Sequence, residues 1–355
     1  MTPDSSTVSR VSGASEALAG DVVVSSRVRL ARNLRGKAFP GWAGSHEREH
    51  VFSQMSRILT AESLLENPSV LQMDELNLIE RDILCEKHLI SAELTLGGSG
   101  TGVVYDRCAG LSVMINEEDH LRMQVLHAGL DLQQAWQVID QLDDRVGHAI
   151  DYAFSPSLGF LTACPSNVGT GMRASVMMHL PGLKLLGEAD PVVQGLTRTG
   201  FAVRGAFGEG SDAFGALYQV SNQTTLGRSE QQTIERLDDM VRSLIDIERN
   251  ARRRLYALPV PRLADHVGRV FGILQYACML SAGEAMDIIS GLRLGLDFDM
   301  VSGTDAECLM AVMQNVQPGH LQQEARRSLL AAERDVFRAG YLRGALTQVK
   351  RTGNV

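Results

Sequence analysis

LSVMINEEDHLRM, residues 111–123, joins a short apolar run to three consecutive acidic residues. The apolar run, residues 111–115, is typical of a buried strand. At its end Glu117, Glu118 and Asp119 repel one another, so a cationic group has to offset them. A guanidinium or a magnesium ion would do so. An isolated acidic triplet is more often a solvated turn. The rest of the chain therefore has to decide whether this segment is a cation site or a solvated turn.

Arginines recur close to predicted strands on both sides of this segment. In VSSRVRL, residues 24–30, alternation places Arg27 and Arg29 on one face of a strand, where two fixed cations need a polyanion. A triphosphate would fit them. Arg122 lies in the acidic segment, Arg173 in GTGMRASV and Arg204 in VRGAFGEG. Each alone is more often a surface residue, but together they indicate a phosphate site.

Two glycine-rich loops complete the pattern. CPSNVGTGMRAS, residues 164–175, contains Gly169 and Gly171, which allow the backbone to approach a ligand closely. RGAFGEGSDAFG, residues 204–215, surrounds Glu209 with glycines, so this carboxylate could close over a substrate. Neither loop matches the Walker loop or the dinucleotide fingerprint.

Bulk properties narrow the class of protein. A chain of 355 residues can form two domains, and its formal net charge of −8 argues against a general nucleic-acid binder. The five cysteines show neither CxxC pairing nor metal-ligand spacing, so no disulfide framework or zinc site is expected. No signal-like or membrane-length apolar stretch is found, and we expect a cytoplasmic protein without membrane contact.

The predicted elements change in character along the chain. Residues 21–237 mix short β-rich runs with helical stretches, which is typical of an α/β or α+β domain. The predicted strands are residues 22–30, 110–116, 173–180 and 215–222, and the predicted helices are residues 47–65 and 121–150. From residue 230 onward long runs of Leu, Ala, Arg and Glu predict a helical domain, with a boundary near the prolines at 259 and 261.

Together, SSRVRLARN, NEEDHLR, CPSNVGTGMRAS and RGAFGEGSDA resemble the catalytic domain of the phosphagen (guanidino) kinases, in that family's order and over residues 22–237. The resemblance implies an α+β fold in which an antiparallel sheet is flanked by helices. We expect this catalytic domain to occupy residues 1–255 and an all-α C-terminal domain to occupy residues 256–355.

Within that family the chain is most similar to the bacterial protein arginine kinases. SSRVR begins at Ser25, so the N-terminal helical domain of the small-molecule kinases is expected to be missing. The helical C-terminal region resembles a dimerisation domain. ERDVFRAG contains the RDxxRA motif, which implies an allosteric phosphoarginine site at Arg334, Asp335 and Arg338. On a helix, the two arginines share one face at i and i+4.

The resemblance also assigns roles in catalysis. Glu118 and Glu209 would clamp and deprotonate the guanidinium, and Cys164 would add a third negative partner as a thiolate. The ATP phosphates would be bound by Arg27, Arg29, Arg122, Arg173 and Arg204. Magnesium would ride on the phosphates, with no direct protein ligand and Glu117 as a water-mediated contact.

Three further residues of these motifs are not expected to act in catalysis. His120 is expected to make a structural hydrogen bond that holds the acidic turn. Met177 occupies a position where small-molecule kinases carry a histidine near the adenine, and Asp212 receives no role.

The function implied is transfer of the ATP γ-phosphoryl group to arginine residues in proteins, in stress response and marking for proteolysis. The expected partners are protein substrates, a second copy of the chain, an activator protein and a Clp-type protease. A kinase for free arginine or another small guanidino compound remains the nearest alternative. An inactive regulator that senses phosphoarginine is the alternative from another class.

Overall fold

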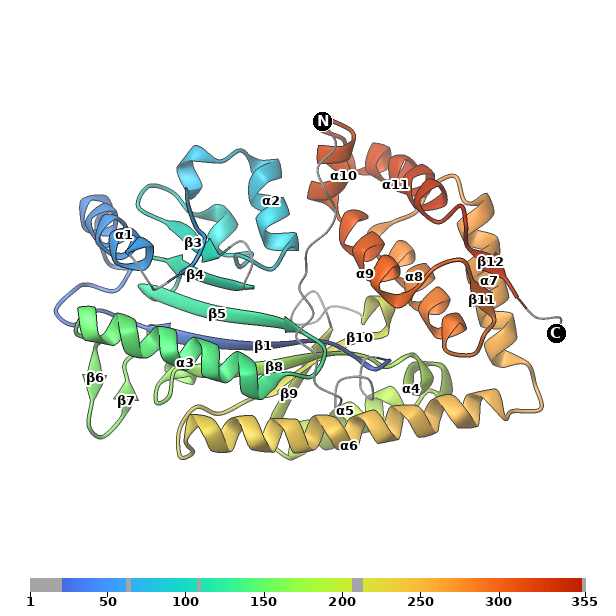
Figure 1. Ribbon diagram of the computed structural model, residues 1–355, viewed down its shortest axis with the longest axis horizontal. Coiled ribbons are helices and arrows are strands. Elements are labelled where there is room, and N and C mark those ends of the chain that lie inside the picture. Colours follow the sequence, from blue (N-terminus) through green and yellow to red (C-terminus); the bar gives the residue numbers. More distant parts are fainter. Residues whose placement is uncertain (1–20, 62–64, 107–109, 206–212, 353–355) are drawn as a thin grey trace.

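A single antiparallel sheet organises the larger region of the molecule (Figure 1). The computed structural model describes residues 21–61, 65–106, 110–205 and 213–352. The eight strands follow the order β2-β3-β4-β5-β1-β8-β10-β9, and every neighbouring pair is antiparallel. Their bounds are β1 (Val23–Arg32), β2 (Pro68–Gln72), β3 (Gly102–Asp106), β4 (Leu111–Ile115), β5 (Leu121–Ala128), β8 (Met172–His179), β9 (Phe201–Gly205) and β10 (Leu217–Asn222). The predicted α+β fold with an antiparallel sheet is confirmed.

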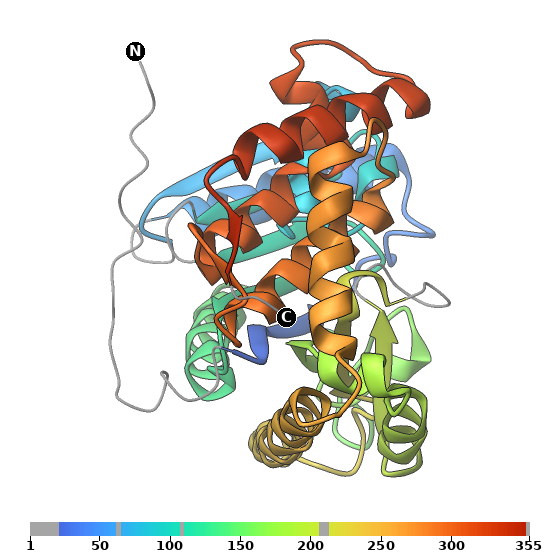
Figure 2. The same ribbon diagram turned by 90° about the vertical axis from the view of Figure 1, so that its right-hand side faces the viewer.

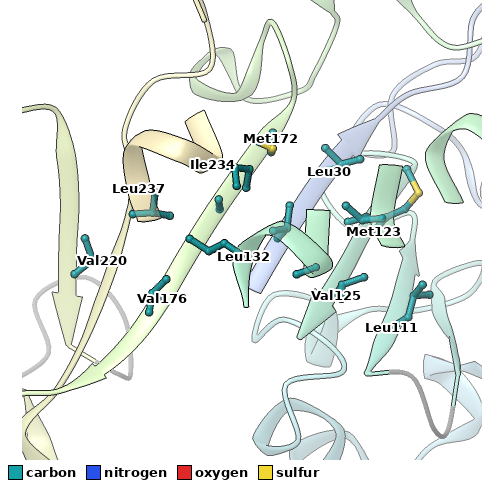
Figure 3. Packing of buried hydrophobic residues seen from close by; sticks show 14 of the residues in the cluster. Leu30, Leu111, Met123, Val125, Leu132, Met172, Val176, Val220, Ile234 and Leu237 are labelled. Atoms are coloured by element: carbon teal, nitrogen blue, oxygen red, sulfur yellow. The ribbon is translucent and has the colours of Figure 1, made fainter. Parts of the chain in front are cut away.

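Helices α3 (Leu132–Ala149) and α6 (Glu230–Tyr256) cover one face of this sheet (Figure 1). Strand alternation explains the arrangement, because Val28 and Leu30 of β1 are completely buried while Arg27 and Arg29, which alternate with them, point to the other face. Figure 3 shows Leu30 in the same apolar cluster as Leu132 of α3 and Leu237 of α6. The sheet therefore keeps one face for packing and leaves the other for polar side chains.

The remaining elements of the larger region are shorter. They are α1 (Ser45–Thr60), α2 (Leu78–Glu86), α4 (Pro181–Leu186), α5 (Ala189–Arg198), the 3-10 turns η2 (Met73–Glu75), η3 (Leu94–Leu96), η4 (Pro165–Asn167) and η5 (Phe214–Ala216), and the small hairpin β6 (Phe154–Ser155) and β7 (Gly159–Phe160). All four predicted strands are present. The predicted helix at residues 47–65 corresponds to α1, which ends earlier because Ala61 adopts an extended conformation.

The prediction of one helix over residues 121–150 is wrong at its start. Its first eight residues form β5, in which Leu121, Met123 and Val125 are buried at a spacing of two. Strand β5 pairs with β4 on one side and β1 on the other. Gly129, with a φ of +69°, then turns the chain before α3 begins. Hydrogen bonds to two neighbouring strands decide the conformation here, and local periodicity does not reveal them.

The C-terminal region is helical. Its elements are α7 (Arg262–Tyr276), α8 (Ala282–Leu296), α9 (Ala306–Asn315), α10 (Pro318–Glu324), α11 (Ala331–Ala345), and a small sheet of β11 (Val301–Ser302) and β12 (Lys350–Arg351). The last pair departs from the expected all-α content. Figures 1 and 2 show these helices, in orange to red, as one group beside the large sheet. Helices α7, α8, α9 and α11 share a second apolar cluster, which also includes Leu217 of β10 and Leu255 of α6.

Among the helices in the described part of the chain, none is long and apolar enough to cross a lipid bilayer.

Candidate active site

One cavity of about 410 Å³ collects most of the predicted site residues. The five predicted phosphate-binding arginines line it, together with the acidic turn and the cysteine of the glycine-rich loop. These lining residues are Arg27, Arg29, Arg122, Arg173, Arg204, Glu117, Glu118, Asp119 and Cys164. Glu209 and Asp212 lie outside the residues that the structure describes.

Sheet register explains why the arginines converge. On the central strand β1, Arg29 lies opposite Arg173 of β8 on one side and Gln124 of β5 on the other. Arg27 is two residues away on the same face, and its Nη2 donates a 2.8 Å hydrogen bond to Gln219 Oε1 on β10. Gln219 is in turn the register partner of Arg204 on β9. Antiparallel pairing of β5, β1, β8, β10 and β9 therefore builds one cationic surface.

Without a bound anion, the positive charges of these arginines repel one another. Burial lowers the pKa of Arg27 to about 10, and the positive charges of Arg122 and Arg173 act in the same direction. Burial is also the main cause that lowers the pKa of Arg29, and the positive charges of Arg27, Arg122 and Arg173 lower it further. Within the described part of the chain, the buried Nε atom of Arg29 has no hydrogen-bond partner. A bound polyanion would offset the repulsion and supply acceptors.

The acidic turn has one buried and one accessible glutamate. Glu117, with a side chain only 3% exposed, lies 2.5 Å from Nη1 of Arg122 and also accepts a hydrogen bond from Ser91 Oγ. Its carboxylate therefore fixes Arg122. Glu118 is exposed in the cavity, and no hydrogen bond to its carboxylate is found within the described residues. Partial burial, followed by the charges of Asp119 and Glu117, raises the pKa of Glu118. Such a carboxylate is available to accept a proton or to orient a cation.

Asp119 joins the acidic turn to the loop that carries Cys164. Its Oδ1 accepts hydrogen bonds from Asn33 Nδ2 at 2.5 Å and from the backbone N–H of Ala163 at 2.6 Å. The Asn33 side chain also accepts a hydrogen bond from the backbone N–H of His120. These bonds set the position of Cys164 relative to Glu118, although the two residues are 46 apart in sequence. The sequence identified Asp119 only as a member of the acidic triplet, and it gave no indication of the role of Asn33.

Two other predicted side chains are placed by short-range contacts. The Nδ1 atom of His120 accepts a 3.3 Å hydrogen bond from the backbone N–H of Leu34, so the expected structural hydrogen bond is present. The Sγ atom of Cys164 lies 3.0 Å from Ser166 Oγ and faces the cavity. Met177 lines a smaller neighbouring cavity of about 60 Å³ together with Arg27.

The segment that follows α2 forms a wall of the main cavity that the sequence analysis missed. It contributes His88, Ile90, Ser91, Ala92 and Glu93 to the lining, and α2 itself contributes Cys85. One local signal for α2 was available, because Asn77 and Glu80 form a reciprocal capping box at its first turn.

The predicted phosphoarginine residues lie together on α11, away from this cavity. Arg338 is buried, and it donates hydrogen bonds to the carbonyls of Val316 at 2.8 Å and Leu280 at 2.6 Å and to Asp335 Oδ1 at 2.6 Å. Arg334 is only half-buried and donates to the carbonyl of Leu329. Of the two arginines, Arg334 is the more accessible to a ligand.

Comparison with known proteins assigns the chain to a family. Residues 50–251 match the model described as ATP:guanido phosphotransferase, C-terminal catalytic domain. The chain belongs to this family. Residues 261–355 match the model of the protein-arginine kinase McsB C-terminal domain. A protein-arginine kinase of Moorella thermoacetica is 45% identical over 92% of this chain and 94% of its own length. One of Pelotomaculum thermopropionicum is 43% identical over 91% of this chain and 92% of its own length.

Solved structures agree with the fold. Lombricine kinase has a TM-score of 0.57 at 25% identity, over 65% of this chain and 67% of its own. The duplicated taurocyamine kinase from Schistosoma mansoni, with bound transition state analog components, has a TM-score of 0.61 at 24% identity, over 75% of this chain and 38% of its own. The resemblance to the guanidino kinases, and among them to the protein arginine kinases, is confirmed.

Proposed function

We propose that this protein transfers the γ-phosphoryl group of ATP to a guanidino nitrogen of arginine residues in proteins. The observation that carries the proposal is that five arginines share one cavity with Glu118 and Cys164. Such a cavity combines a site for a polyanion with carboxylate and thiol groups that suit a guanidinium. The similarity to the protein-arginine kinases of Moorella thermoacetica and Pelotomaculum thermopropionicum supports arginine in proteins as the acceptor.

In the proposed mechanism, the arginine cluster binds the phosphates of ATP and stabilises the charge on the group in transfer. Arg29 is at the centre of this cluster, since it lies on the central strand opposite Arg173 and two residues from Arg27 on the same face. Magnesium on the phosphates would neutralise further charge, and Glu117 is the proposed water-mediated contact. Because Glu117 already pairs with Arg122, it would act on both groups from one fixed position.

The acceptor presents a different problem, because a guanidinium has a pKa above about 12 and is not nucleophilic while fully protonated. Glu118 is proposed to orient it and to accept its proton as the N–P bond forms. Glu209 is the proposed second carboxylate of this clamp and Cys164 its third partner. The hydrogen bonds of Asp119 support this assignment, since they hold the Cys164 loop against the acidic turn.

We further propose that residues 1–255 form the catalytic domain and that residues 256–355 form a domain for dimerisation and phosphoarginine binding. The division is supported by a second apolar cluster, formed mostly by the C-terminal helices and joined by Leu217 of β10 and Leu255 of α6. Exposed Ile273, Tyr276 and Met279, which are 45%, 79% and 53% accessible, support a self-association surface. From the family resemblance alone we propose roles in stress response and proteolysis, an activator protein and a Clp-type protease. Cytoplasmic localisation is proposed from the sequence pattern.

The proposed function is tested by incubating the protein with ATP, magnesium and an unfolded model protein, and by mapping phosphoarginine with mass spectrometry. Free arginine is assayed in parallel, and Glu118→Gln serves as the catalytic control. Phosphoarginine on the protein and little on free arginine is the expected result. Modification of free arginine alone would favour a small-molecule kinase. Nucleotide binding without any transfer would favour a phosphoarginine-sensing regulator.

A further inference from the structure

The cavity wall that follows α2 is fixed to the acidic turn. Ser91 Oγ donates a hydrogen bond to Glu117 Oε1 and accepts one of 3.1 Å from the backbone N–H of Leu94. The backbone N–H of Ser91 also points to Met114 Sδ at 3.3 Å. Leu94 itself is only 1% exposed, so it anchors the other end of this short segment in the protein interior. The backbone between these two anchors has a defined position at the cavity.

Glu93 is the charged residue between those anchors. It lines the cavity with Glu118, and its side chain is exposed. Within the described residues its carboxylate has no hydrogen bond and no ion pair, and it does not cap the η3 turn that it precedes. Burial and the charges of Asp119 and Glu117 raise the pKa of Glu118 most, and the charge of Glu93 raises it further. Glu93 and Glu118 thus present their negative charges to the same cavity.

The three glutamates of the cavity differ in how accessible their side chains are. The Glu117 side chain is 3% exposed beside Arg122, whereas Glu118 and Glu93 are both exposed. If the phosphates occupy the arginine cluster and the guanidinium meets Glu118, the remainder of the acceptor extends toward the accessible rim. Glu93 is the other exposed carboxylate of this lining, so we infer that the α-carbon end of the acceptor lies beside it.

Arginine in a polypeptide and free arginine differ at that end. A residue within a chain presents neutral amide groups there, whereas free arginine presents an α-carboxylate. We propose that Glu93 is a specificity-determining residue that repels a free α-carboxylate and so favours arginine within a polypeptide. The inference rests on the proposed function. Because the charges meet near solvent, the expected discrimination is about two- to fivefold, the range measured for exposed charge pairs.

Two small acceptors isolate this effect. Nα-acetylarginine carries the α-carboxylate, and Nα-acetylarginine amide replaces it with a neutral amide without altering the guanidinium. Wild type should show a higher kcat/KM for the amide. Glu93→Gln should reduce this preference about two- to fivefold, mainly through KM, and Glu93→Lys should reduce it further or reverse it. Added salt should also reduce the preference of wild type, because it screens exposed charges.

Glu75→Gln is the matched control, since Glu75 is exposed and lies outside the cavity lining. Its amide preference should equal that of wild type. Equal preferences in wild type, Glu93→Gln and Glu93→Lys would overturn the assignment of Glu93 and leave the proposed function intact. Absence of any phosphorylation of the amide and of an unfolded protein by wild type would instead contradict the proposed function.

Discussion

The carboxylate of Glu86, at the end of α2, lies 2.6 Å from Nδ1 of His320 in α10. It also accepts the backbone N–H groups of Gly319 at 2.6 Å and His320 at 3.0 Å. Both side chains are largely buried, and Figure 1 shows the two helices side by side. A Cβ atom at Gly319 would lie 2.9 Å from Cβ of Asp82, so only glycine permits this approach. Because α2 leads into the cavity wall, this contact links the C-terminal helices to the candidate active site.

Glu86→Ala should lower the free energy of unfolding by about 1–3 kcal/mol, because two backbone donors and a histidine lose their buried acceptor. Urea denaturation measures the change. Glu75→Ala, at an exposed position of the same region, should stay within about 0.5 kcal/mol of wild type. An unfolding free energy of Glu86→Ala equal to that of wild type would show that the contact does not stabilise the protein.

Glu118→Gln should reduce the rate of phosphoryl transfer by on the order of 10² or more, because the amide can neither accept the proton nor pair with the guanidinium. ATP affinity should be retained, since the phosphates are assigned to the arginines. Single-turnover kinetics and a nucleotide titration measure the two quantities. Glu209→Gln should behave in the same way. Near-normal turnover of both variants would exclude the carboxylate clamp.

The pH dependence of the reaction follows from the raised pKa of Glu118. A general base acts only when it is deprotonated, so kcat/KM should fall as the pH drops through this pKa. Burial and neighbouring carboxylates raise that pKa, so the acidic limb should lie at a higher pH than an ordinary, solvent-exposed glutamate would give. The residual rate of Glu118→Gln should lack this limb. If the same limb persists in that variant, another group is responsible for it.

Arg29→Ala should weaken ATP binding without lowering the thermal stability of the nucleotide-free protein. Loss of a charged hydrogen-bond donor should weaken ATP binding about tenfold or more. Without nucleotide, the melting temperature should be unchanged or higher, because the substitution removes a cation crowded by other arginines. Thermal melts with and without ATP measure both effects, with Arg57→Ala on the exposed side of α1 as the control. A normal ATP-induced shift would refute the assignment.

Arg334→Ala should abolish any response of activity to added phosphoarginine and leave the fold and ATP binding intact. The single variant is preferable to one that includes Arg338, because Arg338→Ala would leave the Val316 and Leu280 carbonyls without their donor. Activity is measured against phosphoarginine concentration, with Arg262→Ala as an exposed control. Identical curves for wild type and Arg334→Ala would contradict a regulatory site here. Light scattering tests the dimer separately.

The sequence by itself determined the family, the antiparallel α+β class and the placement of Arg27 and Arg29 on one strand face. These conclusions depend on ordered motifs and on a side-chain period of two, and both can be read along the chain. Periodicity failed at residues 121–128, where pairing with β4 and β1 overrides a helix-like pattern. Strand formation there depends on partners that are distant in the chain.

Only the tertiary structure decided which carboxylate is buried and which is accessible. Glu117 and Glu118 are adjacent and chemically identical in the sequence, yet one pairs with Arg122 and the other faces the cavity. The wall that carries Glu93 and the contact between Glu86 and His320 were also beyond the sequence. The latter pair is separated by 234 residues. The environment of a charged side chain is set by groups that the fold brings to it, and local sequence does not record them.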